Sequence, residues 1–472
     1  MPGQMENCGL CRKRFTVTAY TRAGPDGGLL CNPCGKELDK NEKAAAGKAK
    51  APKGGSGRRK VQSKILSGTY RIGAKSLMTL CIQTLANNIH LAEDLGDLPE
   101  PIIDKISREL SRRRLLDSNT LNLFLQPTSE TLRIYDGAKL QLQDMMRILQ
   151  TMPNLKNLKL RNAIQFKDSV MEYLISRDIK LKGLQLHGSN LISESLWIKY
   201  IENKGSSLET LQIYYTDKHV TDKIIPYLHQ HAPNLKRLKI VHNEVLGNDG
   251  VREMGNLSRL EHLSLNLHKK VHPDVFVDVL GKIGPALHTF SIEEVPHVDN
   301  TVLDAIHTKC RSLRKLRITD SEVMTDEGFV RLFKDWENRP LTFLDLQKCR
   351  HMSDESHRTN TENVGLCSNG FKALMEHSGK ELKHLNVHAC RNISAAAFEE
   401  AFGPDKRYPN LVDLEISFCE EVTDFIVGSI FRSCPNLKKI NVFGCMKVKS
   451  VRIPRGKILV GVPTAIGMLT EG

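Results

Sequence analysis

The chain has 472 residues, 12 cysteines and a formal charge of +14, and 40% of its residues are hydrophobic. This is enough apolar material for a large core, which excludes wholesale disorder. No run of about 18 apolar residues is present, which excludes a transmembrane helix, and the first 30 residues lack the apolar core of a secretory signal. We therefore expect a reducing compartment in which the cysteines are thiols or metal ligands.

The positive charge is concentrated near the start of the chain. Residues 1–75 contain 16 Lys and Arg but 5 Asp and Glu, a net charge of +11, which leaves only +3 for the rest. A basic leader before a nearly neutral body indicates that the leader meets an anion and the body meets another kind of partner.

Residues 1–35 are expected to form a small metal-binding module. Cys8-x2-Cys11 is followed, after 19 residues, by Cys31-x2-Cys34. Four thiolates at this spacing suit one structural Zn²⁺ and leave no open coordination position for catalysis. The intervening segment reads as strand, turn and strand. The alternatives are a disulfide pair or free thiols, and the paired spacing disfavours both.

Residues 36–64 are rich in Lys, Ala and Gly and are predicted to form a basic, flexible linker, because they cannot bury enough surface to offset the entropy of ordering. The basic side chains of the module and linker are candidates for sequence-tolerant contacts with nucleic-acid phosphates. The candidates are Arg12, Lys13, Arg14, Lys53, Arg58, Arg59 and Lys60. A nuclear-import signal centred on GRRKVQSK, or a simply solvated linker, are the other interpretations.

Residues 65–127 carry apolar side chains at three- and four-residue spacings and are predicted to form a helical cap. Within 95–114, Leu98 and a proline precede an amphipathic helix with apolar Ile102, Ile103 and Ile106. This helix faintly resembles an F-box or Elongin-binding helix, which would dock an adaptor of a ubiquitin ligase. Alternatively, it covers the exposed core of the first repeat, and one helix could do both.

Residues 128–453 repeat a Leu-x-x-Leu-x-Leu unit. It begins at residues 155, 181, 208, 235, 260, 287, 313, 341, 382, 411 and 437, and a degenerate unit begins at 131. This periodicity is the signature of leucine-rich repeats, in which each unit makes one short strand and returns through a helix. The fold class is therefore predicted as α/β: a leucine-rich-repeat solenoid of about 12 repeats, with a parallel sheet on its concave side.

Eight residues after the first Leu, the repeat needs Asn or Cys to bond the backbone of the turn. Asn243, Cys349, Cys390, Cys419 and Cys445 stand there, so we interpret these thiols as structural. The one long interval contains a polar insertion near 355–368, expected to project as a loop with Cys367 incidental to the core. Residues 448–453 are expected to form the last strand, and residues 454–472 the C-terminal cap.

The outward strand positions are predicted to form the concave surface. Early and middle repeats place basic residues there, and Arg237, Lys239, Lys315 and Arg317 are our candidates for partner contacts. Late repeats place Asp and Glu there, and this gradient suits a protein partner better than a uniform phosphate track. Ordinary solvated positions are the alternative. No GxxxxGK(S/T), GxGxxG, HExxH or GxSxG motif is present, so we assign no catalytic residues.

Taken together, the chain resembles the fungal Rad-seven proteins of nucleotide excision repair. The resemblance is carried by CGLCRKRFTVTAYTRAGPDGGLLCNPC, LSRRRLLDSNTLNLFL, TLRIYDGAKL and NVFGCMKVKSVRIPRGKILVGVP, and it covers nearly the whole chain. It implies a non-catalytic nuclear subunit of global-genome repair that works with a SWI/SNF-type ATPase carrying a RING finger on damaged DNA or chromatin. It also implies a link to a cullin-type ubiquitin ligase through Elongin C or a Skp-like adaptor. No membrane or small-molecule partner is expected.

Overall fold

The computed structural model describes residues 4–18, 21–24, 27–45, 75–216, 218–351 and 360–462. The chain divides into two compact units, Met1–Lys64 and Ile65–Gly472, and each is described by itself. Within the described ranges, no helix combines the length and the apolarity needed to cross a membrane.

The first unit is a small module. Strand β1 (Met5–Asn7) pairs antiparallel with β2 (Arg14–Thr16), and helix α1 (Asn32–Ala45) starts directly after Cys31. The strand expected after the turn is reduced to an isolated antiparallel bridge between Ala23 and Leu29. Helix α1 runs past residue 35, so residues 36–45 are helical rather than the start of a flexible linker. Lys, Glu and Ala in this stretch are strong helix formers, whereas residues 46–64 lie outside the described ranges.

The second unit opens with short helices in the segment predicted to be helical. These are α3 (Leu77–Asn87), η1 (Ile89–Leu91), α4 (Glu100–Arg112), α5 (Ser118–Leu121) and η2 (Asn122–Phe124). Helix α4 packs against the first strand of the sheet. Ile106 and Leu110 on its inner face are 1% and 0% exposed. The cap therefore covers the apolar end of the repeat stack.

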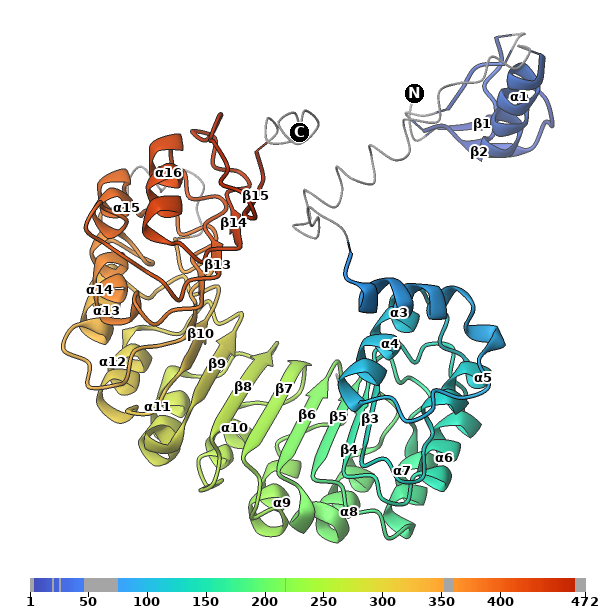
Figure 1. Ribbon diagram of the computed structural model, residues 1–472, viewed down its shortest axis with the longest axis horizontal. Coiled ribbons are helices and arrows are strands. Elements are labelled where there is room, and N and C mark those ends of the chain that lie inside the picture. Colours follow the sequence, from blue (N-terminus) through green and yellow to red (C-terminus); the bar gives the residue numbers. More distant parts are fainter. Residues whose placement is uncertain are drawn as a thin grey trace. The chain divides into compact units, whose positions relative to one another are not determined.

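Thirteen strands form a parallel sheet in strict chain order, from β3 to β15, which lines the inner side of the arc in Figure 1. They are β3 (Thr131–Ile134), β4 (Asn157–Leu160), β5 (Gly183–His187), β6 (Thr210–Tyr214), β7 (Arg237–Asn243), β8 (His262–Leu267), β9 (Thr289–Glu293), β10 (Lys315–Ile318), β11 (Phe343–Asp345), β12 (His384–Asn386), β13 (Asp413–Glu415), β14 (Lys439–Asn441) and β15 (Ile458–Val460).

Helices return the chain along the outer side of the arc (Figure 1). They are α6 (Leu142–Thr151), α7 (Asp168–Ser176), α8 (Glu194–Lys204), α9 (Ile224–His231), α10 (Asn248–Met254), α11 (Pro273–Ile283), α12 (Asn300–Lys309), α13 (Asp326–Phe333), α14 (Ser368–Ser378), α15 (Ala395–Ala401) and α16 (Asp424–Ser433), with the 3-10 turns η3 (Gly205–Ser207) and η4 (Gly284–Ala286). The predicted leucine-rich-repeat solenoid is confirmed.

The repeat leucines build one continuous core. Leu158, Leu184, Leu211, Leu238 and Leu263 are each at most 2% exposed and lie in register on neighbouring strands. Alternation sends these side chains inward and leaves the residues between them on the concave surface. Each unit covers the apolar face of its neighbour, which a single unit could not do for itself.

In five repeats the turn after the strand is held by the predicted Asn or Cys. Asn243 is fully buried and donates to the carbonyls of Thr216 and Val220 while accepting from the backbone N–H of Val245 and Leu246. The cysteines at this position each donate one S–H to a carbonyl in the preceding repeat, as Cys390 does to Leu346 at 3.2 Å. The cysteines are therefore structural thiols, as predicted.

Two expectations about the last repeats are wrong. The final strand is β15 at Ile458–Val460, inside the segment expected to be a cap, and residues 448–453 form no strand. Cys367 is 5% exposed and precedes α14, where its N–H donates to Asp326 at 2.8 Å. The end of the insertion, around Gly365, packs back on Arg350 through an antiparallel bridge. Residues 352–359 of the insertion lie outside the described ranges.

Candidate metal centre and interaction surfaces

The four predicted metal ligands converge in the first unit. The Sγ atoms of Cys8, Cys11, Cys31 and Cys34 all lie within 4.8 Å of one another, and those of Cys11 and Cys31 are 3.6 Å apart. Two local structures place them: the turn after β1, where Arg12 N–H bonds to the Cys8 carbonyl at 2.9 Å, and the first turn of α1, where Gly35 N–H bonds to Cys31. Arg12 adopts a positive φ of 57° to close the first turn.

The chemistry of this donor set fits a divalent metal. Backbone N–H groups, that of Cys11 foremost, lower the pKa of Cys8 to about 6. The neighbouring Cys31 and Cys11 sulfurs raise the pKa of Cys34 to about 12, because several thiolates cannot share one site without a cation. A Zn²⁺ ion supplies that cation and is bound by four thiolates in a closed, structural site. The chain thus holds one structural zinc through these four cysteines.

The structure describes only some of the basic residues that were predicted to contact nucleic acid. Arg12, Lys13 and Arg14 are exposed beside the cysteine turn, on and before β2. Lys53, Arg58, Arg59 and Lys60 lie outside the described residues. The exposed triplet sits on a rigid turn, so its side chains can meet a polyanion without further ordering of the backbone.

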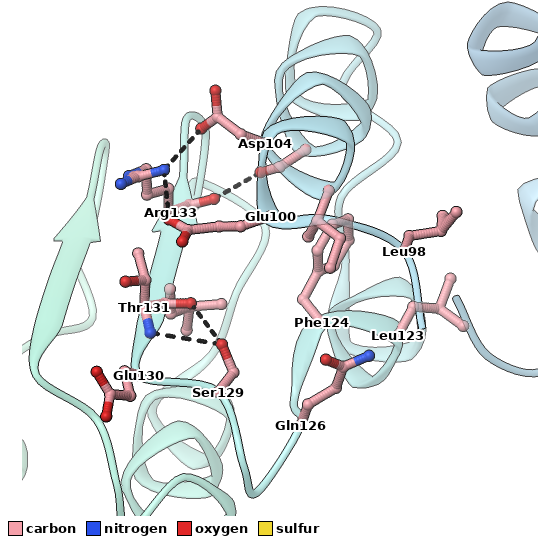
Figure 2. Close-up of a pocket in the computed structure, with 13 residues that line it drawn as sticks. Leu98, Glu100, Asp104, Leu123, Phe124, Gln126, Ser129, Glu130, Thr131 and Arg133 are labelled. Carbon is pink, nitrogen blue, oxygen red and sulfur yellow. Dashed lines mark hydrogen bonds and ion pairs between the residues drawn. The ribbon is translucent and has the colours of Figure 1, made fainter. Parts of the chain in front are cut away.

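Helix α4, the expected adaptor helix, is fastened to the solenoid. Figure 2 shows Arg133 of β3 reaching Glu100 and Asp104 of α4, at 2.9 and 3.9 Å. Ser107 also donates to the Arg133 carbonyl at 2.6 Å. Leu98 and Phe124 line a hollow of about 330 Å³ between the helix and the strand.

The apolar side chains predicted to contact an adaptor mostly face this solenoid. Ile106 is 1% exposed, and Leu98, Ile102 and Ile103 are partly buried against the core. These contacts make α4 a cap of the first repeat. They leave little apolar surface on it for another protein.

Helix α3 instead exposes an apolar face that the sequence interpretation missed. Leu77 and Leu80 are 76% and 46% exposed, and Cys81, one turn after Leu77, is exposed beside them. The opposite face of α3 buries Ile82 and Ala86. The sequence did contain a signal for this exposed face, because the helix is apolar on both sides. Packing on the solenoid needs only one apolar face, so the other is free to contact a partner.

The concave candidates occupy two strands of the sheet. Arg237 and Lys239 lie on β7 and Lys315 and Arg317 on β10, three strands further along. Arg317 pairs with Glu293 and Asp345, both at 2.9 Å. The four basic residues share one hollow of about 280 Å³ with the rings of Tyr214 and Phe343, so the structure brings all four together.

The comparisons with known proteins all find similarity to fungal DNA repair proteins or to leucine-rich repeats. Residues 2–40 match the treble clef domain of DNA repair protein rhp7, and residues 231–255 match a leucine-rich repeat. The chain is 27% identical to DNA repair protein rhp7 of Schizosaccharomyces pombe over 451 residues, which cover 94% of this chain and 76% of the relative. It is 23% identical to DNA repair protein RAD7 of Saccharomyces cerevisiae over 405 residues, which cover 78% of this chain and 66% of the relative.

Among solved structures, the fold is similar to that in the crystal structure of the Rad7 and Elc1 complex in yeast. The TM-score is 0.65 at 20% identity, and the match covers 83% of this chain and 100% of the other. Fold and metal centre together define a leucine-rich-repeat protein preceded by a treble-clef zinc module. The chain is similar over most of its length to fungal Rad7 and rhp7 proteins, which are named as DNA repair proteins.

Proposed function

We propose that this chain is a nuclear adaptor of global-genome nucleotide excision repair, in which the zinc module attaches to damaged DNA or chromatin and the solenoid holds a SWI/SNF-type ATPase with a RING finger. The observation that carries the proposal is that the chain consists of two units with different surfaces. A rigid module that exposes Arg12, Lys13 and Arg14 precedes a solenoid whose large inner surface has a different charge pattern. The relatives named as DNA repair proteins support this role.

DNA attachment is tested with the full chain and a labelled DNA duplex in fluorescence anisotropy. Changing Arg12, Lys13 and Arg14 to Gln should weaken binding and reduce the slope of log affinity against log salt by about 3, since each lost phosphate contact removes about one released counterion. The matched control changes Lys199, Lys380 and Lys406, three exposed lysines of the solenoid, to Gln. An unchanged slope in the first variant would remove the module from DNA binding.

The ATPase partner is tested by affinity purification from ultraviolet-treated nuclei, in mild and in strong salt. The adaptor role predicts that a SWI/SNF-type ATPase is recovered with the chain. Recovery of cullin and Elongin C without any repair ATPase would instead leave the ligase role as the better account.

The second candidate function is a substrate receptor of a cullin-type ubiquitin ligase, and the exposed face of α3 favours it. A helix that presents Leu77, Leu80 and Cys81 at three- and four-residue spacing can enter an apolar groove of another protein. We assign this face to an Elongin-C-type or Skp-like adaptor, because the structural relative was crystallised with Elc1. The predicted contacts of α4, through Leu98, Ile102 and Ile103, would then be limited to its exposed edge. Both functions can coexist, since they use different surfaces.

The α3 assignment is tested by pull-down with purified Elongin C and, in parallel, a Skp-type adaptor. Changing Leu77 and Leu80 to Ser should abolish capture while the circular dichroism spectrum is retained, since both side chains are exposed. Leu191→Ser is the matched control, because this leucine is 50% exposed in a solenoid loop. Capture that survives the double change but is lost on altering Ile102 and Ile103 would move the interface to α4.

A further inference from the structure

The middle of the concave surface holds basic side chains that form no ion pair with a described carboxylate. Across the parts of the chain that the structure describes, no ion pair joins Arg237, Lys239 or Lys315 to a carboxylate, whereas Arg317 has two. Arg237 and Lys239 are only partly exposed, and Lys239 lies over the ring of Tyr214, 5.5 Å from its centroid. Glu261 acts on Arg237 and Glu293 on Lys239, each opposing the lowering of the cation's pKa by burial, but neither of these described carboxylates forms an ion pair with it. These cations therefore lose hydration without a directly bonded counter-charge, which favours an anionic ligand.

The pKa values of the neighbouring groups also indicate a positive potential at this surface. Burial, the main cause, lowers the pKa of both Lys239 and Arg237. Burial and then the positive charge of Arg237 lower the pKa of His262 to about 4, although Glu261 opposes this. The same positive potential disfavours a metal cation at the cluster of Glu261, His262 and His288, despite its suitable donor atoms.

The sheet register puts charged positions at regular intervals. Arg237 and Lys315 occupy one row across the strands, and Lys239 and Arg317 the next. Continued over three more strands, these rows reach Asp413 and Glu415 of β13. Strands lie about 4.8 Å apart, so each three-strand step spans about 14 Å, which is about four residues of extended chain.

The far end of these rows is acidic and also lacks strong partners. Asp413 has His384 at 4.0 Å, and Glu415 accepts hydrogen bonds from Asn441 and Ser417. Neither is paired with a described Lys or Arg. A nucleic-acid strand that followed the basic rows would meet these carboxylates, whereas a polypeptide can match both ends.

We propose that the concave surface binds an extended acidic segment of a partner protein, with Asp or Glu side chains about four residues apart over β7 and β10 and a Lys or Arg about four residues further on, over β13. The basic hollow bounded by Tyr214 and Phe343 receives the acidic side chains. Ser264 and Ser291, 9% and 4% exposed, are small enough to leave the floor of that hollow open. This inference rests on the proposed adaptor function and names the chemistry of its partner.

The test uses the purified full chain and a random dodecapeptide phage library, followed by anisotropy with the enriched peptides and with dT12. Wild-type protein should enrich peptides with paired acidic residues followed by a basic one. Changing Arg237 and Lys239 to Gln should weaken these peptides about 30-fold, as for the loss of buried charged contacts. The matched control, Lys199→Gln with Lys380→Gln, removes the same charge from exposed lysines of the solenoid and should leave affinity unchanged.

A second variant tests the contact between the distal basic residue of the segment and β13. Changing Asp413 and Glu415 to Lys should shift enrichment from a basic to an acidic residue at the distal position. Enrichment without acidic residues, or equal binding of acidic peptides to the Arg237 and Lys239 variant, overturns the inference. So does tight dT12 binding that this variant loses, since the surface would then bind nucleic acid. Duplex binding by the module and adaptor capture by α3 do not depend on these residues, so either proposal can fail alone.

Discussion

Asn243 offers a direct measure of what the turn position contributes to the solenoid. Its side chain is fully buried and makes four hydrogen bonds at 2.7–3.2 Å, two donated to Thr216 and Val220 and two accepted from Val245 and Leu246. Alanine would remove all four and leave buried backbone groups unsatisfied. At about 1 kcal/mol net for each bond, Asn243→Ala should destabilise this part of the stack by about 4 kcal/mol.

The comparison site is Cys390, which occupies the same position in a later repeat. Its thiol makes one short contact, to the Leu346 carbonyl at 3.2 Å. Cys390→Ala should therefore cost only about 1–2 kcal/mol, for one weak hydrogen bond and a small loss of packing. Asn243→Cys should fall between the two, because a thiol can donate one bond but cannot bridge both sides of the turn.

The assay is native-state hydrogen exchange with mass spectrometry, which measures opening locally in a repeat array whose unfolding need not be all-or-none. Peptides that contain Val220 and Leu246 should exchange faster in Asn243→Ala, by the factor that corresponds to the lost free energy. Equal losses for Asn243→Ala and Cys390→Ala would refute the argument that hydrogen-bond number sets the stability of the turns.

Three further outcomes are expected. Purified protein should contain one zinc per chain by atomic emission, and Cys34→Ser should lose it together with the fold of residues 4–45 but leave the solenoid's thermal transition in place. With zinc bound, Cys81 alone should react rapidly with iodoacetamide, because its side chain is exposed. Cys390 should react slowly, because burial raises the pKa of its thiol well above the usual value. Rapid labelling of Cys390 would contradict its assignment as a buried thiol. The lowered pKa of His262 makes its cation less stable in the folded than in the unfolded chain, so stability should be full above pH 6.5 and fall as the pH drops toward 4. In urea titrations, His262→Gln should reduce the loss of unfolding free energy at low pH. If the variant shows the same dependence of unfolding free energy on pH as the wild type, His262 is not its source.

The agreement between sequence and structure is closest where the pattern is periodic. Leucines at fixed intervals must face one way on each strand, so the parallel sheet, its inward residues and the Asn or Cys of the turn followed from spacing alone. The four cysteines were equally readable, because two Cys-x-x-Cys pairs supply a complete tetrahedral donor set.

The ends of the stack were harder to predict, since no repeat fixes them. Residues 448–453 have the composition of a strand, yet Ile458–Val460 form it, because Leu459 and Val460 are the residues that complete the core beside β14. Cys367 looked incidental in a polar insertion but is buried where the chain re-enters the stack.

Local sequence thus determined what each repeat and the cysteine module would become, because the interactions that define them recur at fixed spacing. Only the tertiary structure decided which apolar helix face would remain free. Helices α3 and α4 both have apolar faces. Helix α4 buries Ile106 and Leu110 against the first repeat, while Leu77 and Leu80 of α3 remain exposed. It also decided that Arg317 forms ion pairs with Glu293 and Asp345 while Arg237 and Lys239 form none with a described residue, since ion pairs depend on residues brought together from separate strands.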